Sequence, residues 1–181
     1  YGTTKLTPEN ARNLELGLRY HEGRSEFSAT VYRNRVSDQV SFQSGASGCA
    51  SSFGCYVSVA QAQYQGLTLA AATEVWGLRW HGAVDFNSAK DGASGLYLAR
   101  RAKQYGNLGA SREIVGWQWG ANLQWSARRF DDAANTKVLA GYGLWSFTAS
   151  KQLARDWKLL ARLDNAFDKR YETAATYATE G

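Results

Sequence analysis

The sequence of 181 residues has no methionine, one proline and two histidines. No run of about 18 or more apolar residues occurs, which excludes a membrane-spanning helix. No Gly-x-Ser-x-Gly, phosphate loop, dinucleotide fingerprint or His-Glu-x-x-His motif is present. The residues therefore predict no enzyme, no catalytic residue and no bound cofactor. A chain without methionine that starts at Tyr1 and stops at Gly181 is expected to be part of a longer one.

The charge is basic overall but not concentrated. The net charge is +5, and the basic residues occur singly or as pairs such as Arg100-Arg101 and Arg128-Arg129, interspersed with acids. Nucleic-acid binding calls for a clustered basic stripe, so we expect no nucleic-acid partner. A basic wall facing anionic lipid headgroups or a polar lumen, and an ordinary solvated surface, both remain open.

The only two cysteines, Cys49 and Cys55, lie in a stretch rich in serine and glycine from Ser44 to Gly54. Since His21 and His81 are the only histidines, we expect no zinc site and predict no metal. A disulfide between the two cysteines is the favoured use of the pair, and two free thiols are the alternative. A ring this small would shape a loop and add only about 2 kcal/mol of stability.

Aromatic residues make up 13% of the chain, with 18 glycines, and this composition favours strands. From Trp117 to Ser126 every second residue is apolar, which is the period of a strand with one apolar and one polar face. Similar alternation predicts eight strands: 13–20, 26–34, 63–75, 78–88, 103–111, 117–127, 140–150 and 157–164. The predicted fold class is all-β.

Short and long connections alternate between these strands. The short ones fall at 21–25, 76–77, 112–116 and 152–156, and the long ones at 35–62, 89–102 and 128–139. In an antiparallel up-and-down sheet, consecutive connections emerge at opposite ends. One rim of tight turns and one rim of loops is typical of bacterial outer-membrane barrels.

Aromatic placement indicates which face meets lipid. Tyr20, Trp76, Trp80, Trp117 and Trp157 stand beside the short turns, as in the aromatic girdle of a membrane barrel. The opposite face carries ionised groups that an apolar core could not accommodate: Glu15, Arg19, Arg79, Asp85 and Arg162. We therefore predict an antiparallel transmembrane β-barrel with its apolar face toward lipid and its polar face toward a wet lumen.

Several motifs in order resemble one family. Asn165-Ala166-Phe167-Asp168-Lys169-Arg170-Tyr171-Glu172, with Tyr177 and Gly181, is similar to the near-terminal signature of TonB-dependent outer-membrane receptors. Further matches are Thr7-Pro8-Glu9, Asn13-Leu14-Glu15-Leu16-Gly17, Tyr32-Arg33-Asn34-Arg35-Val36-Ser37-Asp38 and Tyr64-Gln65-Gly66-Leu67. Leu98-Ala99-Arg100-Arg101-Ala102-Lys103 resembles the cobalamin (vitamin B12) receptors within the family. Ala166 departs from the family's usual leucine, and the loop with Cys49 and Cys55 has no counterpart that we can place.

The resemblance implies that residues 1–181 are the C-terminal part of a plugged barrel of about 22 strands, with the plug, the earlier strands and the last strand absent. It further implies import of cobalamin or a similar large metal chelate, such as a siderophore, across the bacterial outer membrane. The expected partners are that ligand, a TonB-type energy-coupling protein acting through an absent N-terminal segment, and outer-membrane lipid and lipopolysaccharide.

Four residues are the candidate ligand contacts at the loop rim. Arg100 matches the family position on the ligand path, where a guanidinium can donate to amide or phosphate oxygens. Arg129, Phe130 and Asp131 open the next long loop, and an aromatic between charges suits a large chelate. The alternatives are a headgroup or strand-end role for Arg100 and ordinary loop roles for the others. Asp131 and Asp132 together fall short of the oxygens that calcium needs.

Two other functions remain open from the residues alone. Eight strands could close into a stand-alone barrel with a structural or adhesive role. Exposed aromatics are also compatible with a soluble carbohydrate-binding β domain, because a soluble sandwich has the same period with its faces exchanged.

Overall fold

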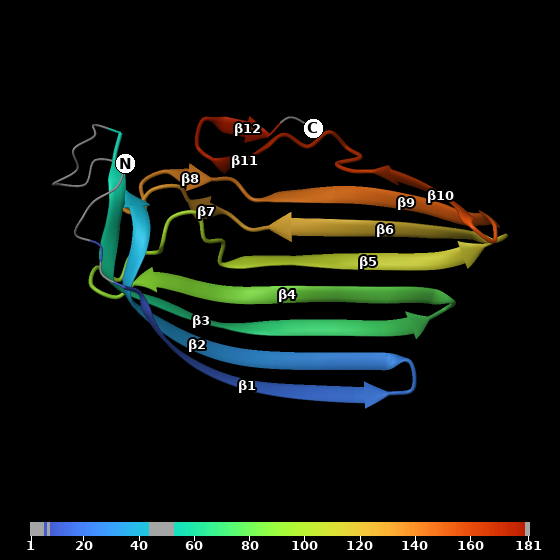
Figure 1. Ribbon diagram of the computed structural model, residues 1–181, viewed down its shortest axis with the longest axis horizontal. Helices are drawn as coiled ribbons and strands as arrows, with labels where there is room; N and C mark the ends of the chain where they lie inside the picture. The colour runs from blue at the N-terminus through green and yellow to red at the C-terminus, as the bar shows by residue number, and fades with distance from the viewer. Residues whose placement is uncertain (1–5, 7, 44–52, 180–181) are drawn as a thin grey trace.

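The computed structural model describes residues 6, 8–43 and 53–179 (Figure 1). None of these residues belongs to a helix long and apolar enough to cross a membrane. The strands are β1 (Asn10–Glu22), β2 (Ser25–Gln43), β3 (Cys55–Val75), β4 (Leu78–Asp91), β5 (Gln104–Ile114), β6 (Trp117–Ser126), β7 (Arg129–Phe130), β8 (Val138–Leu139), β9 (Tyr142–Ala154), β10 (Trp157–Leu163), β11 (Tyr171–Ala174) and β12 (Tyr177–Thr179).

Eight of the strands form one antiparallel sheet in the order β1-β2-β3-β4-β5-β6-β9-β10. All eight predicted strands are confirmed. The short connections gather at one end of the sheet, on the right in Figure 1. Two of these turns have positive φ at both central residues, Trp76 and Gly77 in one and Val115 and Gly116 in the other. This is the type I′ geometry that matches the twist of paired strands.

The prediction of a long connection over residues 35–62 is wrong. β2 continues to Gln43 and β3 begins at Cys55, so the two strands stay paired well beyond the sheet's other members. Figure 1 shows this extension bending away at the left end. Backbone hydrogen bonds hold it, and its residues do not keep a strict alternation of apolar and polar side chains. The alternation that reveals a membrane strand is therefore lost, although the strand persists.

The register places most of the apolar residues of the eight strands on one face. One row across the sheet runs Leu18, Ala29, Leu69, Val84, Gly106 and Trp125. This face is uncovered: the exposed fractions of Leu14, Leu16 and Leu18 are 72%, 74% and 73%. In the described part of the chain no second sheet packs against it. A soluble sandwich, which would bury this face, is therefore not what the sequence folds into.

The same sheet does not close on itself. β1 and β10 are its two edges, and within the described residues they do not pair with each other. An open, exposed edge is a row of unpaired backbone donors and acceptors, which a membrane barrel cannot leave facing lipid. The structure thus disfavours a stand-alone eight-stranded barrel and fits a part of a larger one.

The opposite face of the sheet carries a polar network. Asp85, with 8% of its surface exposed, accepts hydrogen bonds from Tyr32 at 3.0 Å and Thr68 at 2.6 Å. Nearer the short turns, Arg79 donates to Gln118 at 2.8 Å. The predicted lumen residues all fall on this face: Asn13, Glu15, Arg19, Arg79, Asp85, Gln118, Asn122 and Gln124. Charged and amide groups there require water or a polar partner.

Candidate ligand site at the loop rim

Three segments meet at the end of the sheet opposite the short turns. They are the connection between β4 and β5 (residues 92–103), the hairpin of β7 and β8, and the hairpin of β11 and β12. The first is anchored to β4 by the bridge between Lys90 and Tyr97, and β7 pairs with β8. We call these three segments the rim platform.

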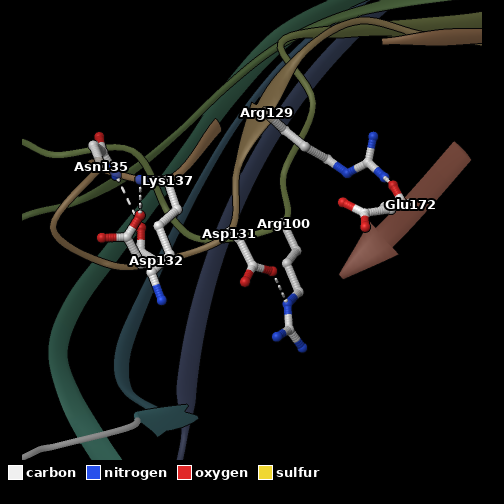
Figure 2. Close-up of polar contacts among 7 residues, drawn as sticks. All are labelled: Arg100, Arg129, Asp131, Asp132, Asn135, Lys137 and Glu172. Carbon is white, nitrogen blue, oxygen red and sulfur yellow. Dashed lines mark hydrogen bonds and ion pairs between the residues drawn. The ribbon is translucent and has the colours of Figure 1, made fainter. Parts of the chain in front are cut away.

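The first two segments are joined at Arg100. Its backbone N–H donates to the Phe130 carbonyl at 2.6 Å, and its Nε donates to the Asp131 carboxylate at 2.8 Å (Figure 2). Arg100 has φ of 61°, an uncommon value for a residue with a side chain. The structure therefore brings together Arg100, Phe130 and Asp131, which the sequence placed in two separate loops. The Arg100 side chain remains 58% exposed.

Asp131 is the point where all three segments meet. Its side chain is only 11% exposed. Burial raises the pKa of this carboxyl, but hydrogen bonds from Arg100 and from the backbone N–H of Ala175, with the positive charges of Arg100 and Lys137, outweigh burial and lower the pKa. The carboxylate is thus ionised at neutral pH and links the β4–β5 connection to the C-terminal hairpin.

Arg129 makes the second link to that hairpin. Its Nη2 donates to the Glu172 carbonyl at 2.6 Å, as Figure 2 shows. The guanidinium also lies over the Tyr142 ring, 5.4 Å from its centroid, and the Tyr142 ring contacts the Tyr171 ring with centroids 4.4 Å apart and planes tilted by 38°. Only 7% of Arg129 is exposed, and its Nη1 has no hydrogen-bond partner among the described residues. These contacts favour a positioning role, while a direct ligand contact stays a prediction.

The β7–β8 hairpin is shaped by Asp132, which the sequence offered only as an insufficient calcium ligand, and by Asn135, which it did not single out. The Asp132 carboxylate accepts from the Thr136 hydroxyl at 2.7 Å and from the Lys137 N–H at 2.7 Å. Asn135, with φ of 59°, exchanges two hydrogen bonds with the Tyr97 backbone, at 2.8 and 2.7 Å. An aspartate followed three residues later by an asparagine is a turn signal, although its tertiary partner could not be read from the sequence.

Phe130 is packed against the neighbouring loop. Its ring stacks on Tyr97 with centroids 6.3 Å apart. Lys90 and Lys103 place their ammonium groups 4.9 and 3.9 Å from the centroid of the same Tyr97 ring. Such cation–π contacts each stabilise by about 0.5–1 kcal/mol when exposed. Whether Phe130 touches a ligand stays a prediction.

The rim platform has no metal-binding arrangement. In residues 6, 8–43 and 53–179 no group of three or more His, Cys, Asp or Glu side chains could hold an ion. Asp132 uses its carboxylate oxygens on the turn donors, and Asp131 uses its own on Arg100 and Ala175. Of the predicted disulfide, Cys49 lies outside the described residues, so the pairing stays a prediction. Cys55 begins β3 and is buried, with 6% exposed.

We expect acid to loosen the C-terminal hairpin through Asp131. Because its folded pKa is lowered, the stability that it contributes is present above the unfolded pKa of about 3.9 and is lost as pH falls through the folded value. Hydrogen exchange, corrected for intrinsic rates, should show Ala175 protected at neutral pH and losing protection only below about pH 4. Asp131→Asn should show weak protection throughout, and an equally steep acid loss in this variant would contradict the assignment.

The sequence of this chain is similar to proteins of one known family. The family described as "TonB dependent receptor-like, beta-barrel" matches residues 1–166. The vitamin B12 transporter BtuB of Photobacterium profundum is 28% identical over 177 residues, 97% of this chain and 29% of that protein. The chain thus spans less than a third of this curated relative's length.

Solved structures share the fold. The copper transporter OprC superposes with a TM-score of 0.78 at 23% identity, over 93% of this chain and 27% of that one. The pyoverdine receptor FpvA from Pseudomonas aeruginosa PAO1 gives 0.71 at 17% identity, over 97% of this chain and 28% of that one. The family and these neighbours are proteins of the bacterial outer membrane. The chain belongs to the TonB-dependent receptor family, as an antiparallel part of its outer-membrane β-barrel.

Proposed function

We propose that this chain is the C-terminal part of the barrel of a receptor that imports cobalamin or a similar large metal chelate. The observation that carries the proposal is the rim platform, where an exposed Arg100 is held by Asp131 at the end of the lumen wall that bears the loops. The 28% identity to a vitamin B12 transporter supports cobalamin, while the copper and pyoverdine proteins broaden the class to metal-containing cargo.

The polar face of the sheet supports the remaining parts of the proposal. A wall with Arg79, Gln118 and Asp85 can hydrogen-bond a plug and its waters during transport. We propose that such a plug precedes residues 1–181 in the intact protein, that earlier strands and a last strand complete the barrel, and that a TonB-type coupling protein acts on an N-terminal segment. The role is that of a receptor and not of an enzyme.

Uptake by cells tests the proposal. A strain that lacks its own cobalamin receptor and depends on external cobalamin should grow when it carries the intact protein that contains this chain. Uptake of labelled cyanocobalamin should stop when the proton gradient is dissipated, because import of this kind is energised. Parallel arms with ferric pyoverdine and with copper identify the cargo. If the protein took up none of the three probes, the proposal would be overturned.

We expect Arg100→Gln to weaken ligand binding about tenfold, since a hydrogen bond from a charged donor contributes about 1.5 kcal/mol. Arg101→Gln is the matched control, because Arg101 is adjacent, exposed and equally charged but does not pair with Asp131. Equilibrium binding of cyanocobalamin to the purified intact protein measures the effect. Equal affinities of both variants and the wild type would remove Arg100 from the site.

A further inference from the structure

A row of oxygen-bearing side chains crosses the lumen face of the sheet just inside the rim platform. Thr68 of β3 stands opposite Asp85 of β4, and Asp85 stands opposite Tyr105 of β5. Tyr105 is followed across the sheet by Ser126 of β6 and then Tyr142 of β9. We call these five residues the hydroxyl row, because four of them end in a hydroxyl group and Asp85 ends in a carboxylate. Five neighbouring strands therefore present oxygen atoms at one depth of the wall.

The hydroxyl row lines a hollow in the wall. Its volume is about 460 Å³, which is within the usual range for small-molecule sites. Asn107 and Gln124, which face each other on β5 and β6, line it together with the row. Hydroxyl and side-chain amide groups can both donate and accept hydrogen bonds. Tyr105 is 46% exposed and Gln124 is exposed as well, so a molecule in the lumen can reach these groups.

Asp85 gives the hollow its charge. Only 8% of the residue is exposed, and its carboxylate accepts hydrogen bonds from the hydroxyls of Tyr32 at 3.0 Å and Thr68 at 2.6 Å. Among the described residues that line the hollow, Asp85 is the only charged one, and it belongs to no ion pair of the described chain. A carboxylate accepts hydrogen bonds and donates none. The hollow therefore favours ligand groups with N–H or O–H donors and disfavours negative charge.

The hollow adjoins the candidate ligand site at the rim. Tyr142, the last member of the row, lies against the Arg129 guanidinium, 5.4 Å from its ring centroid, and contacts the Tyr171 ring with centroids 4.4 Å apart. Both Arg129 and Tyr171 belong to the rim platform, where Arg100 is exposed. Cargo that leaves Arg100 and moves inward along this wall thus meets the hydroxyl row next.

We propose that the hollow is a second ligand site on the lumen wall, which binds uncharged amide and hydroxyl groups of the cargo and in which Asp85 selects against anionic cargo. This inference rests on the receptor function proposed above and narrows its substrate class to chelates with a neutral surface rich in amides or hydroxyls. Asn107, Gln124 and the hydroxyl row supply the hydrogen-bond partners. The tyrosine rings of the row add flat apolar surface. The rim and the wall then recognise different parts of one molecule.

Matched forms of one probe test the site. The monocarboxylates of cyanocobalamin each have one side-chain amide hydrolysed, so they differ from the parent compound by one negative charge. Equilibrium binding to the purified intact protein gives the ratio of the parent's affinity to the affinity of each monocarboxylate. Repulsion between two unit charges about 6 Å apart in water changes affinity about threefold. For the isomer whose altered group enters the hollow, Asp85→Asn should lower this ratio about threefold and Gln124→Glu should raise it about threefold.

The control removes a negative charge from the same face outside the hollow. Glu113 of β5 is exposed and lies opposite Gln118, about 27 Å along the strand from Tyr105. Glu113→Gln should leave every ratio at its wild-type value. An equal shift in this control, or no shift for any isomer in the two hollow variants, would overturn the proposal. Because Gln124→Glu changes an exposed side chain, it keeps the test valid if Asp85→Asn does not fold.

Uptake separates a failure of this inference from a failure of the receptor proposal. Unchanged ratios in a protein that imports cyanocobalamin would overturn the second site and leave the receptor function standing. Import of ferric pyoverdine or copper without binding of any cobalamin form would overturn the second site as well, because the cargo would then lack the neutral surface that the hollow is proposed to bind. If none of the probes were bound or imported, both proposals would fail.

Discussion

Leu123→Arg is expected to lower the free energy of unfolding in a bilayer by about 2–4 kcal/mol, the cost of an arginine facing lipid near midplane depth. Leu123 lies within β6, opposite Leu108 of β5 and Trp145 of β9, on the face that carries the apolar rows. No carboxylate accompanies it in this row of described residues to offset the charge. Urea unfolding of the intact protein in phosphatidylcholine vesicles measures the loss.

Gln124→Arg is the matched control, one residue along the same strand. Gln124 lies opposite Asn107 and shares a hollow with Asp85 and Tyr105, so its new charge would enter a polar lumen. We expect a change of about 0.5 kcal/mol or less, as for an exposed substitution. Similar losses in both variants would mean that the two faces of the sheet are assigned wrongly.

The strand positions could be read from the sequence because lipid imposes a side-chain period of two. Trp117 to Ser126 alternates without exception, and β6 has those bounds. The period fails where β2 and β3 rise beyond the apolar band. Beyond Val36 the polar residues Ser37 and Asp38 follow one another, although the backbone pairing with β3 continues. Backbone hydrogen bonds are independent of side-chain type, so sequence pattern cannot detect such an extension.

The candidate site was predictable only in part, for a different reason. Arg100 and Asp131 were chosen separately, and their ion pair depends on how two loops separated by two strands pack. Arg129 was chosen beside Phe130 as a ligand contact, yet only 7% of the residue is exposed. The sequence does not show whether an arginine is buried, because the same residue type occurs in buried and in exposed positions. The hydrogen-bond acceptor of Arg129 is the backbone carbonyl of Glu172. Every residue has such a carbonyl, so the sequence cannot indicate which one accepts the bond.

Arg129→Ala is expected to release the C-terminal hairpin from the rim platform. The substitution removes the hydrogen bond to the Glu172 carbonyl and empties the space beside the Tyr142 and Tyr171 rings. A charged hydrogen bond of this kind contributes about 2 kcal/mol, so the hairpin should open about 30-fold more often. Hydrogen exchange at β11 and β12 should quicken by that factor, with β6 unchanged.

Arg170→Ala provides the control, because Arg170 directly precedes β11 and is exposed. Its exchange should match the wild type. Arg129→Lys should recover part of the protection, since an ammonium can still donate to the carbonyl but lacks the planar guanidinium over Tyr142. Unchanged exchange in Arg129→Ala would rule out the anchor.

Ligand binding by the same variant separates positioning from contact. Asp131 accepts the Ala175 N–H of that hairpin as well as Arg100, so an opened hairpin frees Asp131 and Arg100 to shift. If Arg129 acts only through this chain of contacts, Arg129→Lys recovers ligand affinity in step with hairpin protection. If Arg129 contacts the ligand directly, Arg129→Lys lowers ligand affinity by a larger factor than it lowers the hydrogen-exchange protection of the hairpin. The ratio of the two losses therefore decides which role the buried guanidinium has.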